Sequence, residues 1–156
     1  IQTFKNDTKT KILDKISLIT EERVKKYGDN SLTEFRSFHD KQSLNNVLIK
    51  SLSNNPDLIL IFGIHAITDV EDLIPKVIKN NKGKILRFGM PVEPGNLILI
   101  SEITKKNNKQ IFVIGMPSCA KSPKENGVDW ILWRVLSGLE INNNIINKMS
   151  IGGLIK

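Results

Sequence analysis

The sequence lacks several residue types and patterns that mark common protein classes. It has a single cysteine, Cys119, so no disulfide can form within the chain, and this usage fits a reducing compartment. The longest apolar runs, LILIF at 58–62 and LILI at 97–100, are far shorter than the roughly 18 residues of a membrane-spanning helix. We therefore expect a cytoplasmic protein with no membrane partner.

Arginine and histidine are scarce as well. The formal net charge of +7 comes almost entirely from lysines that are spread along the chain, and the arginines are Arg23, Arg36, Arg87 and Arg134. Nucleic-acid-binding surfaces gather their positive charge into a patch or stripe, so we expect no nucleic-acid partner. His65 has only His39 and a distant Cys119 as companions, which does not predict a zinc site.

Length and composition predict one domain. A chain of 156 residues that is 40% hydrophobic and 25% charged supports a single buried core. The opening IQTFKNDTKT has no initiator Met, basic n-region or h-region, so we expect no signal peptide, a truncated N-terminus and a longer parent protein. The tail at 141–156 is Asn-rich and carries a Gly-Gly step, which is typical of a linker and limits the predicted domain to 1–140.

Hydrophobic periodicity predicts a first helix in the segment TKTKILDKISLITEERVKKYG at 8–28. Asp7 or Thr8 can cap its start and Gly28 its end. Its apolar side is formed by residues spaced three or four apart, namely Leu13, Ile16, Thr20, Val24 and Tyr27. A second helix is expected after Asp40 as N-cap, with an apolar side formed by Leu44, Val47, Leu48 and Leu52.

Short apolar or alternating segments predict strands. They are IQTF at 1–4, TEFRSF at 33–38, DLILIFG at 57–63, KILRFGM at 84–90, NLILISEI at 96–103 and KQIFVIG at 109–115. DLILIFG is apolar almost throughout, as expected for a strand buried on both faces of a parallel sheet between helices. The segments at 84–90 and 96–103 are expected to form a hairpin around the turn PVEPGN.

Two further helices complete the pattern. Pro75 is tolerated only in a first helical turn, so Asp72 is the expected N-cap of a third helix. The last helix is long and amphipathic, with Val128, Ile131, Leu132, Val135 and Leu139 facing inward. The order β-α-β-α-β-α-β-β-β-α predicts an α/β fold, a three-layer α/β/α domain with a mostly parallel sheet. Such sheets bind ligands beyond the carboxyl ends of their strands.

The loop GIHAITDVED at 63–72 follows the buried strand and carries Asp69, Glu71 and Asp72 near a helix N-terminus. Carboxylates at such an edge are typical ligands of Mg²⁺ beside a phosphorylated group, so Asp69 and Asp72 are candidate catalytic residues and Asp69 a candidate Mg²⁺ ligand. The structural alternative is that Asp72 only caps its helix and Asp69 is a solvated loop residue. His65 is interpreted as a packing or hydrogen-bonding residue.

The stretch GMPSCAKSPKENGVDW at 115–130 lies between an apolar strand and the last helix. Ser122-Pro123-Lys124-Glu125 matches a capping box, which predicts that this helix begins after Ser122. The preceding loop would then aim unpaired backbone N–H groups at an anion, with Lys121 and Lys124 adding positive charge. Gly127, inside the helix so predicted, indicates close packing or ligand approach.

Three segments resemble, in order and spacing, the molybdopterin-binding domain of molybdenum cofactor biosynthesis. They are FGIHAITDVEDLIP, FGMPVEPGNLILI and VIGMPSCAKSPKENGVDWIL. The chain departs from the usual family motifs at Gly63-Ile64-His65, at Pro94-Gly95-Asn96 and at Met116-Pro117-Ser118-Cys119-Ala120. The versions GMPVEPGNL and PSCAKSPKENGVDW are more similar to a bacterial subgroup in which this domain precedes a nucleotidyltransferase domain of the cytidylyl-transferring type.

The resemblance implies a molybdenum-cofactor-biosynthesis-protein-like fold and a molybdopterin or molybdopterin-nucleotide ligand, with Mg²⁺ and ATP or CTP where nucleotide transfer occurs. It also implies a fused or associated nucleotidyltransferase domain and homo-oligomers. The candidate ligand- or phosphate-binding residues are Gly63, His65, Pro94, Gly95, Asn96, Pro117, Ser118, Cys119, Lys121, Ser122 and Lys124. Two alternatives stay open: a stand-alone Mg²⁺-dependent nucleotidyltransferase acting on the pterin phosphate, and a non-catalytic assembly domain.

Overall fold

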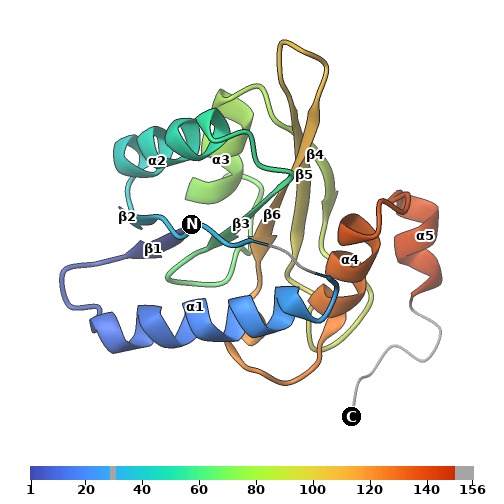
Figure 1. Cartoon of the computed structure of the whole chain (residues 1–156), viewed down its shortest axis with the longest axis horizontal. Helices are drawn as coiled ribbons and strands as arrows, with labels where there is room; N and C mark the ends of the chain where they lie inside the picture. The colour runs from blue at the N-terminus through green and yellow to red at the C-terminus, as the bar shows by residue number, and fades with distance from the viewer. Residues whose placement is uncertain (29–30, 150–156) are drawn as a thin grey trace.

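The computed structural model describes residues 1–28 and 31–149 (Figure 1). The strands are β1 (Gln2–Phe4), β2 (Arg36–Phe38), β3 (Leu58–Phe62), β4 (Lys84–Phe88), β5 (Leu99–Thr104) and β6 (Gln110–Met116). The helices are α1 (Thr10–Lys25), α2 (Lys41–Ser53), α3 (Leu73–Asn80), the 3-10 turn η1 (Ser118–Lys121), α4 (Gly127–Leu136) and α5 (Asn143–Lys148). Up to α4, strands and α-helices follow one another in the predicted order.

The strands form one six-stranded sheet in the order β2-β1-β3-β6-β5-β4. The pairs β1–β2, β1–β3 and β3–β6 are parallel, whereas β5 runs antiparallel to both β6 and β4. This confirms the predicted, mostly parallel sheet and its hairpin between 84 and 103. Crossover helices between the parallel strands place helices on both faces of the sheet.

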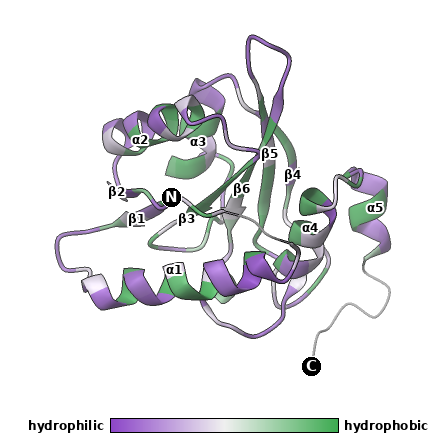
Figure 2. Ribbon diagram, in the orientation of Figure 1, coloured by the Kyte–Doolittle hydropathy of each residue, from purple (hydrophilic) through white to green (hydrophobic). Residues whose placement is uncertain are grey.

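Two hydrophobic clusters separate the three layers. On one face, α2 and α3 cover the sheet, and on the other face α1 and α4 do (Figures 1 and 2). Successive side chains of β3 point to opposite faces of the sheet. Ile59 and Ile61 belong to the cluster beneath α2 and α3, while Leu60 and Phe62 belong to the opposite cluster. The apolar strand is therefore buried on both faces, as its sequence predicts.

The start of α1 differs from the prediction. α1 begins at Thr10 after Lys9, and no side chain caps it. Thr8 instead belongs to the turn after β1, where its hydroxyl accepts a hydrogen bond from the Lys5 amide at 3.0 Å and its own amide donates to the Lys5 carbonyl. Thr8 and the exposed Asp7 are therefore not caps. The predicted apolar face of α1 is confirmed by four buried residues, Leu13, Ile16, Thr20 and Val24.

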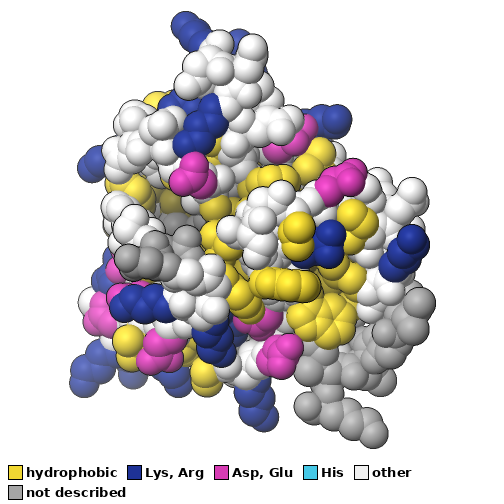
Figure 3. All heavy atoms as spheres, turned by 45° about the vertical axis from the view of Figure 1, so that its right-hand side comes forward, with side chains coloured by type: hydrophobic (Ala, Val, Ile, Leu, Met, Phe, Trp, Pro, Cys, Tyr) yellow, Lys and Arg dark blue, Asp and Glu magenta, His cyan; other side chains and the backbone are white. Residues whose placement is uncertain are grey.

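Part of the predicted tail is a helix. The side chain of Asn142 caps α5 by accepting from the Ile145 amide at 2.9 Å, and Ile146 is buried against the cluster that contains α4. Trp133 of α4 stays 52% exposed, and Figure 3 shows apolar side chains gathered on this side of the molecule. The rest of the tail or linker predicted for 141–156, residues 150–156, lies outside the described residues. Within the described residues, no helix has the length and apolar character needed to cross a bilayer.

Candidate functional site

Three loops meet at the edge formed by the carboxyl ends of the parallel strands. The register pairs Phe62 with Met116, the last residues of β3 and β6, and Leu99 at the start of the antiparallel β5 with Gly115. The first loop (residues 63–72), the second loop (residues 89–98) and the third loop (residues 117–126) therefore leave the sheet side by side. This confirms that the three predicted segments share one edge.

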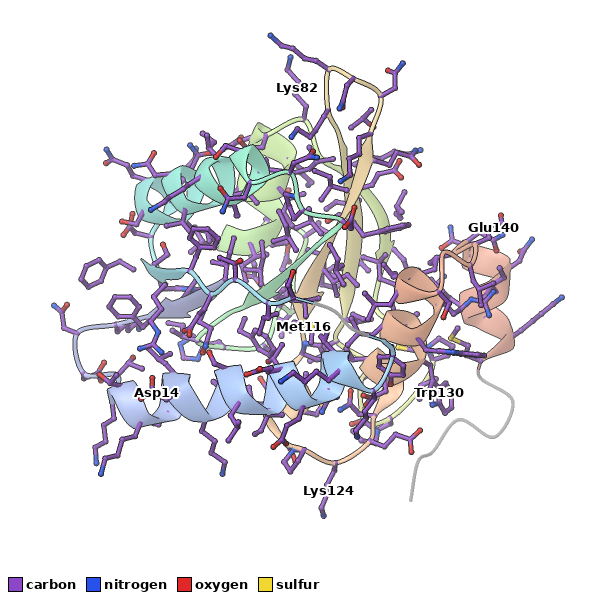
Figure 4. The ribbon with its side chains drawn as sticks, in the orientation of Figure 1. Asp14, Lys82, Met116, Lys124, Trp130 and Glu140 are labelled. Carbon is purple, nitrogen blue, oxygen red and sulfur yellow. The ribbon has the colours of Figure 1, made fainter. Side chains whose placement is uncertain are left out.

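Two hydrogen bonds join the third loop and α4 to the other loops. The Lys121 ammonium donates to the Gly63 carbonyl at 2.8 Å, and the Gly127 amide at the start of α4 donates to the Pro94 carbonyl at 2.8 Å. Met116 lies inside, at the end of β6, whereas Lys124 points away from the molecule at the tip of the third loop (Figure 4). Lys121 and Lys124 therefore do not act as a pair, because only Lys121 reaches another loop.

The first loop is held by the carboxylate of Asp72. Asp72 occupies the N-cap position of α3, as predicted, but its side chain makes no cap bond to the helix. It accepts instead from the amides of Thr68 at 2.8 Å and Asp69 at 3.0 Å, and these backbone hydrogen bonds hold the pKa of Asp72 below its ordinary value. Asp72 thus fixes the shape of the loop from the helix end.

Asp69 is exposed on the same loop, and one of its carboxylate oxygens accepts from the Glu71 amide at 2.6 Å. Within residues 1–28 and 31–149, no group of three or more His, Cys, Asp or Glu side chains gathers where it could hold a metal ion. Mg²⁺ is commonly held by one or two carboxylates together with phosphate oxygens of the substrate. The arrangement fits Mg²⁺ at Asp69 only if the ligand supplies most of the coordination.

The start of α4 differs from the prediction. α4 begins at Gly127, and its capping box is formed by Asn126 and Asp129 rather than by Ser122 and Glu125. Ser122 is the C-cap of η1, and its hydroxyl accepts a 3.3 Å hydrogen bond from the Lys124 amide. The Glu125 carboxylate accepts from the Trp130 indole at 3.3 Å. Leu139, predicted to face inward, lies beyond the end of the helix and is 42% exposed.

A buried ion pair explains the later start of α4. Arg23 of α1 is 4% exposed, and its guanidinium donates to the Asp129 carboxylate at 2.8 Å and to the Ser122 carbonyl at 2.6 Å. The same carboxylate accepts from the Asn126 amide at 2.9 Å. Asp129 therefore neutralises a buried charge while it completes the capping box, which Glu125 on the solvent side cannot do.

The backbone N–H groups at the start of α4 already have protein partners. Gly127 donates to Pro94, Val128 donates to the Asn126 side chain at 3.1 Å, and the third residue, Asp129, completes the box. The expectation of unpaired N–H groups at this helix start was therefore wrong. For an anion at this edge, the third loop therefore offers the ammonium group of Lys121, which contacts the first loop at Gly63. Lys121 is half-buried, and burial lowers its pKa below the ordinary lysine value.

The Pro94-Gly95 turn packs against protein. Gly95 has a φ of +126°, and a Cβ atom there would lie 2.7 Å from the Gly127 amide nitrogen. A Cβ atom on Gly127 would in turn lie 2.8 Å from Met90 Sδ. The close packing predicted for Gly127 is therefore confirmed, because the second loop packs directly against the start of α4. Asn96, in the same loop, is exposed.

The remaining candidates of the third loop differ in exposure. Pro117 is buried, Ser118 is exposed and Cys119 is half-buried. Burial raises the pKa of the Cys119 thiol, which disfavours the thiolate needed for nucleophilic chemistry. Ser118 is therefore the polar side chain of η1 most open to a ligand, while His65 is exposed on the first loop.

The segments that meet at this edge are the ones that resemble the molybdopterin-binding domain. Neither the protein-family models nor the curated proteins compared with this chain give a match. Membership of that family therefore stays a prediction, supported by three motifs that the fold brings together.

We expect the two candidate caps of α4 to differ when each is replaced by alanine. Asn126→Ala should lower the free energy of unfolding by about 1–2 kcal/mol. The substitution removes the side chain that accepts from the Val128 amide and that forms one half of the capping box with Asp129. Ser122→Ala should cost less than about 0.5 kcal/mol, since its hydroxyl holds no helical amide. Urea unfolding of both variants measures the difference, and an equal or larger loss for Ser122→Ala would contradict the assigned cap.

Proposed function

We propose that this domain binds molybdopterin or a molybdopterin nucleotide and acts in molybdenum cofactor biosynthesis, fused to or associated with a nucleotidyltransferase domain. The observation that carries the proposal is the convergence of the three motif-bearing loops at the carboxyl edge of the sheet, where ligands of such sheets bind. The ligand's phosphate is expected beside Lys121, between the first and third loops.

Lys121 is suited to hold that phosphate. An ammonium group has three N–H donors, and among the described residues the structure gives Lys121 one partner, the Gly63 carbonyl. Two donors therefore remain for ligand oxygens. Because Lys121 is half-buried, its charge acts through less water than that of the exposed Lys124. Ser118 and His65 add polar groups on the two loops that Lys121 connects.

The proposal gives this domain a binding role and assigns nucleotide transfer to the partner domain. The stand-alone enzyme would need Asp69 and Asp72 as catalytic groups, and Asp72 is already bonded to two amides of its own loop. Presentation of a bound pterin phosphate to a second domain needs only the binding groups. Asp69→Asn should then leave ligand affinity within about threefold of the wild type in the absence of Mg²⁺.

Isothermal titration with molybdopterin tests the proposal. The wild-type domain should bind, and Lys121→Met should weaken binding about tenfold or more, because a charge-assisted hydrogen bond to the phosphate is lost. Lys124→Met removes the same charge three residues away and serves as the matched control, with an expected change below about threefold. Circular dichroism verifies that both variants are folded. No binding by the wild type at high micromolar ligand would contradict the proposal and favour a non-catalytic assembly domain.

A further inference from the structure

The opposite edge of the sheet, at the amino ends of its parallel strands, carries a slot with a volume of about 430 Å³. Residues 58–60 of β3 form one long side of the slot, and residues 32–35, which lead into β2, form the other. The described residues that line the slot include none from the three loops. The slot is therefore separate from the candidate site.

The slot continues the line of β1. In the sheet, β1 lies between β2 and β3, and Gln2 is paired with Arg36 on one side and with Phe62 on the other. When this register is extended backwards from Ile1, the next three positions fall opposite residues 32–34 on one side and residues 58–60 on the other. These are the two long sides of the slot. The slot therefore has the place and the direction of a β-strand.

Backbone groups of β3 are positioned for such a strand. The nitrogen of Ile1 donates to the Leu60 carbonyl at 2.7 Å, and the Ile1 carbonyl accepts from the Phe62 amide at 2.9 Å, which is the bonding pattern of a parallel ladder. Because ladder bonds alternate between the two sides of a strand, the Leu60 amide and the Leu58 carbonyl also face β1 rather than β6. A strand in the slot would bond to both.

The facing side offers a matching set of groups. The Phe35 carbonyl accepts from the Gln2 amide at 2.8 Å, at the end of the slot. One step further along, the Phe35 amide and the Thr33 carbonyl have no hydrogen-bond partner within residues 1–28 and 31–149. Backbone donors and acceptors on both sides of a gap between strands are a template for strand addition.

The two faces of the slot differ in polarity. Gln2 bonds to the Ser17 hydroxyl of α1, so the first and third residues before Ile1 would face α1 as well, because side chains alternate along a strand. Thr20 and Val24 line the slot on this face. The second residue would face α2, where the slot is lined by the buried Ser51. The slot therefore favours the order apolar, small or polar, apolar.

The amino group of Ile1 gives independent support for a strand that is joined to it. Burial lowers the pKa of this amino group to about 5, and the Glu34 carboxylate, which raises it, does not outweigh burial. An amide N–H in the same place would donate to the Leu60 carbonyl without a buried charge. The surroundings of this nitrogen therefore suit a peptide bond better than an ammonium group.

We propose that the slot holds a strand of about three residues that is joined directly to Ile1, so that β1 continues between residues 32–35 and β3 in a longer form of the polypeptide. A separate peptide in the same register would end beside Ile1 with its own carboxyl group, and two charged termini would then be buried together. A peptide bond removes both charges. This inference does not rest on the proposed function.

An N-terminal extension tests the inference. With Val-Thr-Val added before Ile1, the valines face α1 and the threonine faces α2. Hydrogen exchange of the Leu60 amide should become at least about tenfold slower than in the 156-residue chain, because this amide gains a partner. Val-Pro-Val is the matched control, since proline has no N–H for the Leu58 carbonyl and its ring takes the place of that hydrogen. It should leave the exchange of Leu60 within about threefold.

The dependence of stability on pH gives a second readout. The amino group of Ile1 has an ordinary pKa of 8.0 in the unfolded chain and about 5 in the folded chain, so between these values the unfolded chain binds more protons. This group therefore makes the 156-residue chain less stable as the pH falls from 8 to 5. The Val-Thr-Val extension moves the amino group out of this place. The difference in thermal midpoint between the two chains should therefore widen over the same pH range.

Each outcome decides the inference. Equal exchange of Leu60 with Val-Thr-Val and Val-Pro-Val, or a difference in thermal midpoint that does not change with pH, would contradict it. If the acetylated peptide Val-Thr-Val, supplied free in solution, slows the exchange of Leu60 and the joined extension does not, the slot belongs to a separate chain and the assigned occupant is wrong. Molybdopterin titration decides the proposed function separately, whichever of these results is obtained.

Discussion

Replacing Asp129 with alanine should lower the free energy of unfolding by about 4 kcal/mol. The Arg23 guanidinium is 4% exposed, and among residues 1–28 and 31–149 its carboxylate partner is Asp129 alone, so the substitution leaves an uncompensated charge inside the protein. The same carboxylate completes the capping box of α4 and lies 3.4 Å from the Tyr27 hydroxyl. Equilibrium unfolding in urea, followed by circular dichroism, measures the loss.

Two controls separate the buried charge from other effects. Glu21→Ala breaks an ion pair with Lys25 on the exposed side of the same helix and should cost less than about 0.5 kcal/mol. Adding Arg23→Met to Asp129→Ala removes the stranded charge, so the double variant should be more stable than Asp129→Ala alone. A loss below about 1 kcal/mol for Asp129→Ala, or no recovery in the double variant, would contradict the role given to this pair.

Gly95→Ala should destabilise the protein by about 3 kcal/mol or more. Gly95 has a φ of +126°, which side chains rarely adopt, and an added Cβ would lie 2.7 Å from the Gly127 amide nitrogen and 2.9 Å from its Cα. Both contacts are with backbone at the start of α4, which cannot move aside without losing the bond from Gly127 to Pro94. Thermal and urea unfolding measure the effect.

Gly138→Ala is the matched control for Gly95→Ala. Gly138 also has a positive φ, +66°, but no atom of the described part of the chain lies within 4 Å of an added Cβ. Its substitution should therefore cost only the backbone strain, about 1–2 kcal/mol. Equal losses of unfolding free energy in the two variants would contradict the prediction, because they would show that the close contact between Gly95 and the start of α4 adds nothing to the cost of backbone strain.

These predictions concern how the candidate site is held together. α1 supplies Arg23, which binds the Ser122 carbonyl and the Asp129 carboxylate and so fixes the third loop from outside the three motifs. Lys121 then joins that loop to Gly63. Arg23 is therefore expected to affect ligand binding through the position of Lys121, although it belongs to no motif.

Much of the fold could be predicted from local patterns. The alternating and apolar runs gave the strands, and the continuous apolar run of β3 correctly indicated burial between two layers of helices. Asp40 was correctly predicted as the cap of α2, since its side chain accepts from the Ser43 amide. These features depend on residues within one turn or one strand, where periodicity and capping chemistry act directly.

The site was predicted less completely, because its residues are chosen by contacts between distant segments. Ser122-Pro-Lys-Glu125 satisfies the local rule for a capping box, yet Asn126 and Asp129 form the box. The ion pair between Arg23 and Asp129 is what distinguishes the second pair of residues from the first. α5 was missed because its polar Asn-rich sequence resembles a linker, although Ile146 is buried. Nothing in the sequence placed His39 beside Thr3, a contact that depends on the pairing of β1 with β2.

By itself the sequence determined the order of strands and α-helices up to α4, the layered α/β architecture and the segments that lie at the carboxyl edge of the sheet. Hydrophobic period and proline and glycine placement suffice for these, because each acts within a few residues. Only the tertiary structure decided where α4 begins, that Asp72 holds its own loop, and which lysine joins two loops. Those outcomes depend on two energetic terms, the cost of burying the charge of Arg23 and the need of buried backbone N–H and C=O groups for hydrogen-bond partners. Both terms take their values only when segments that are distant in the sequence pack together.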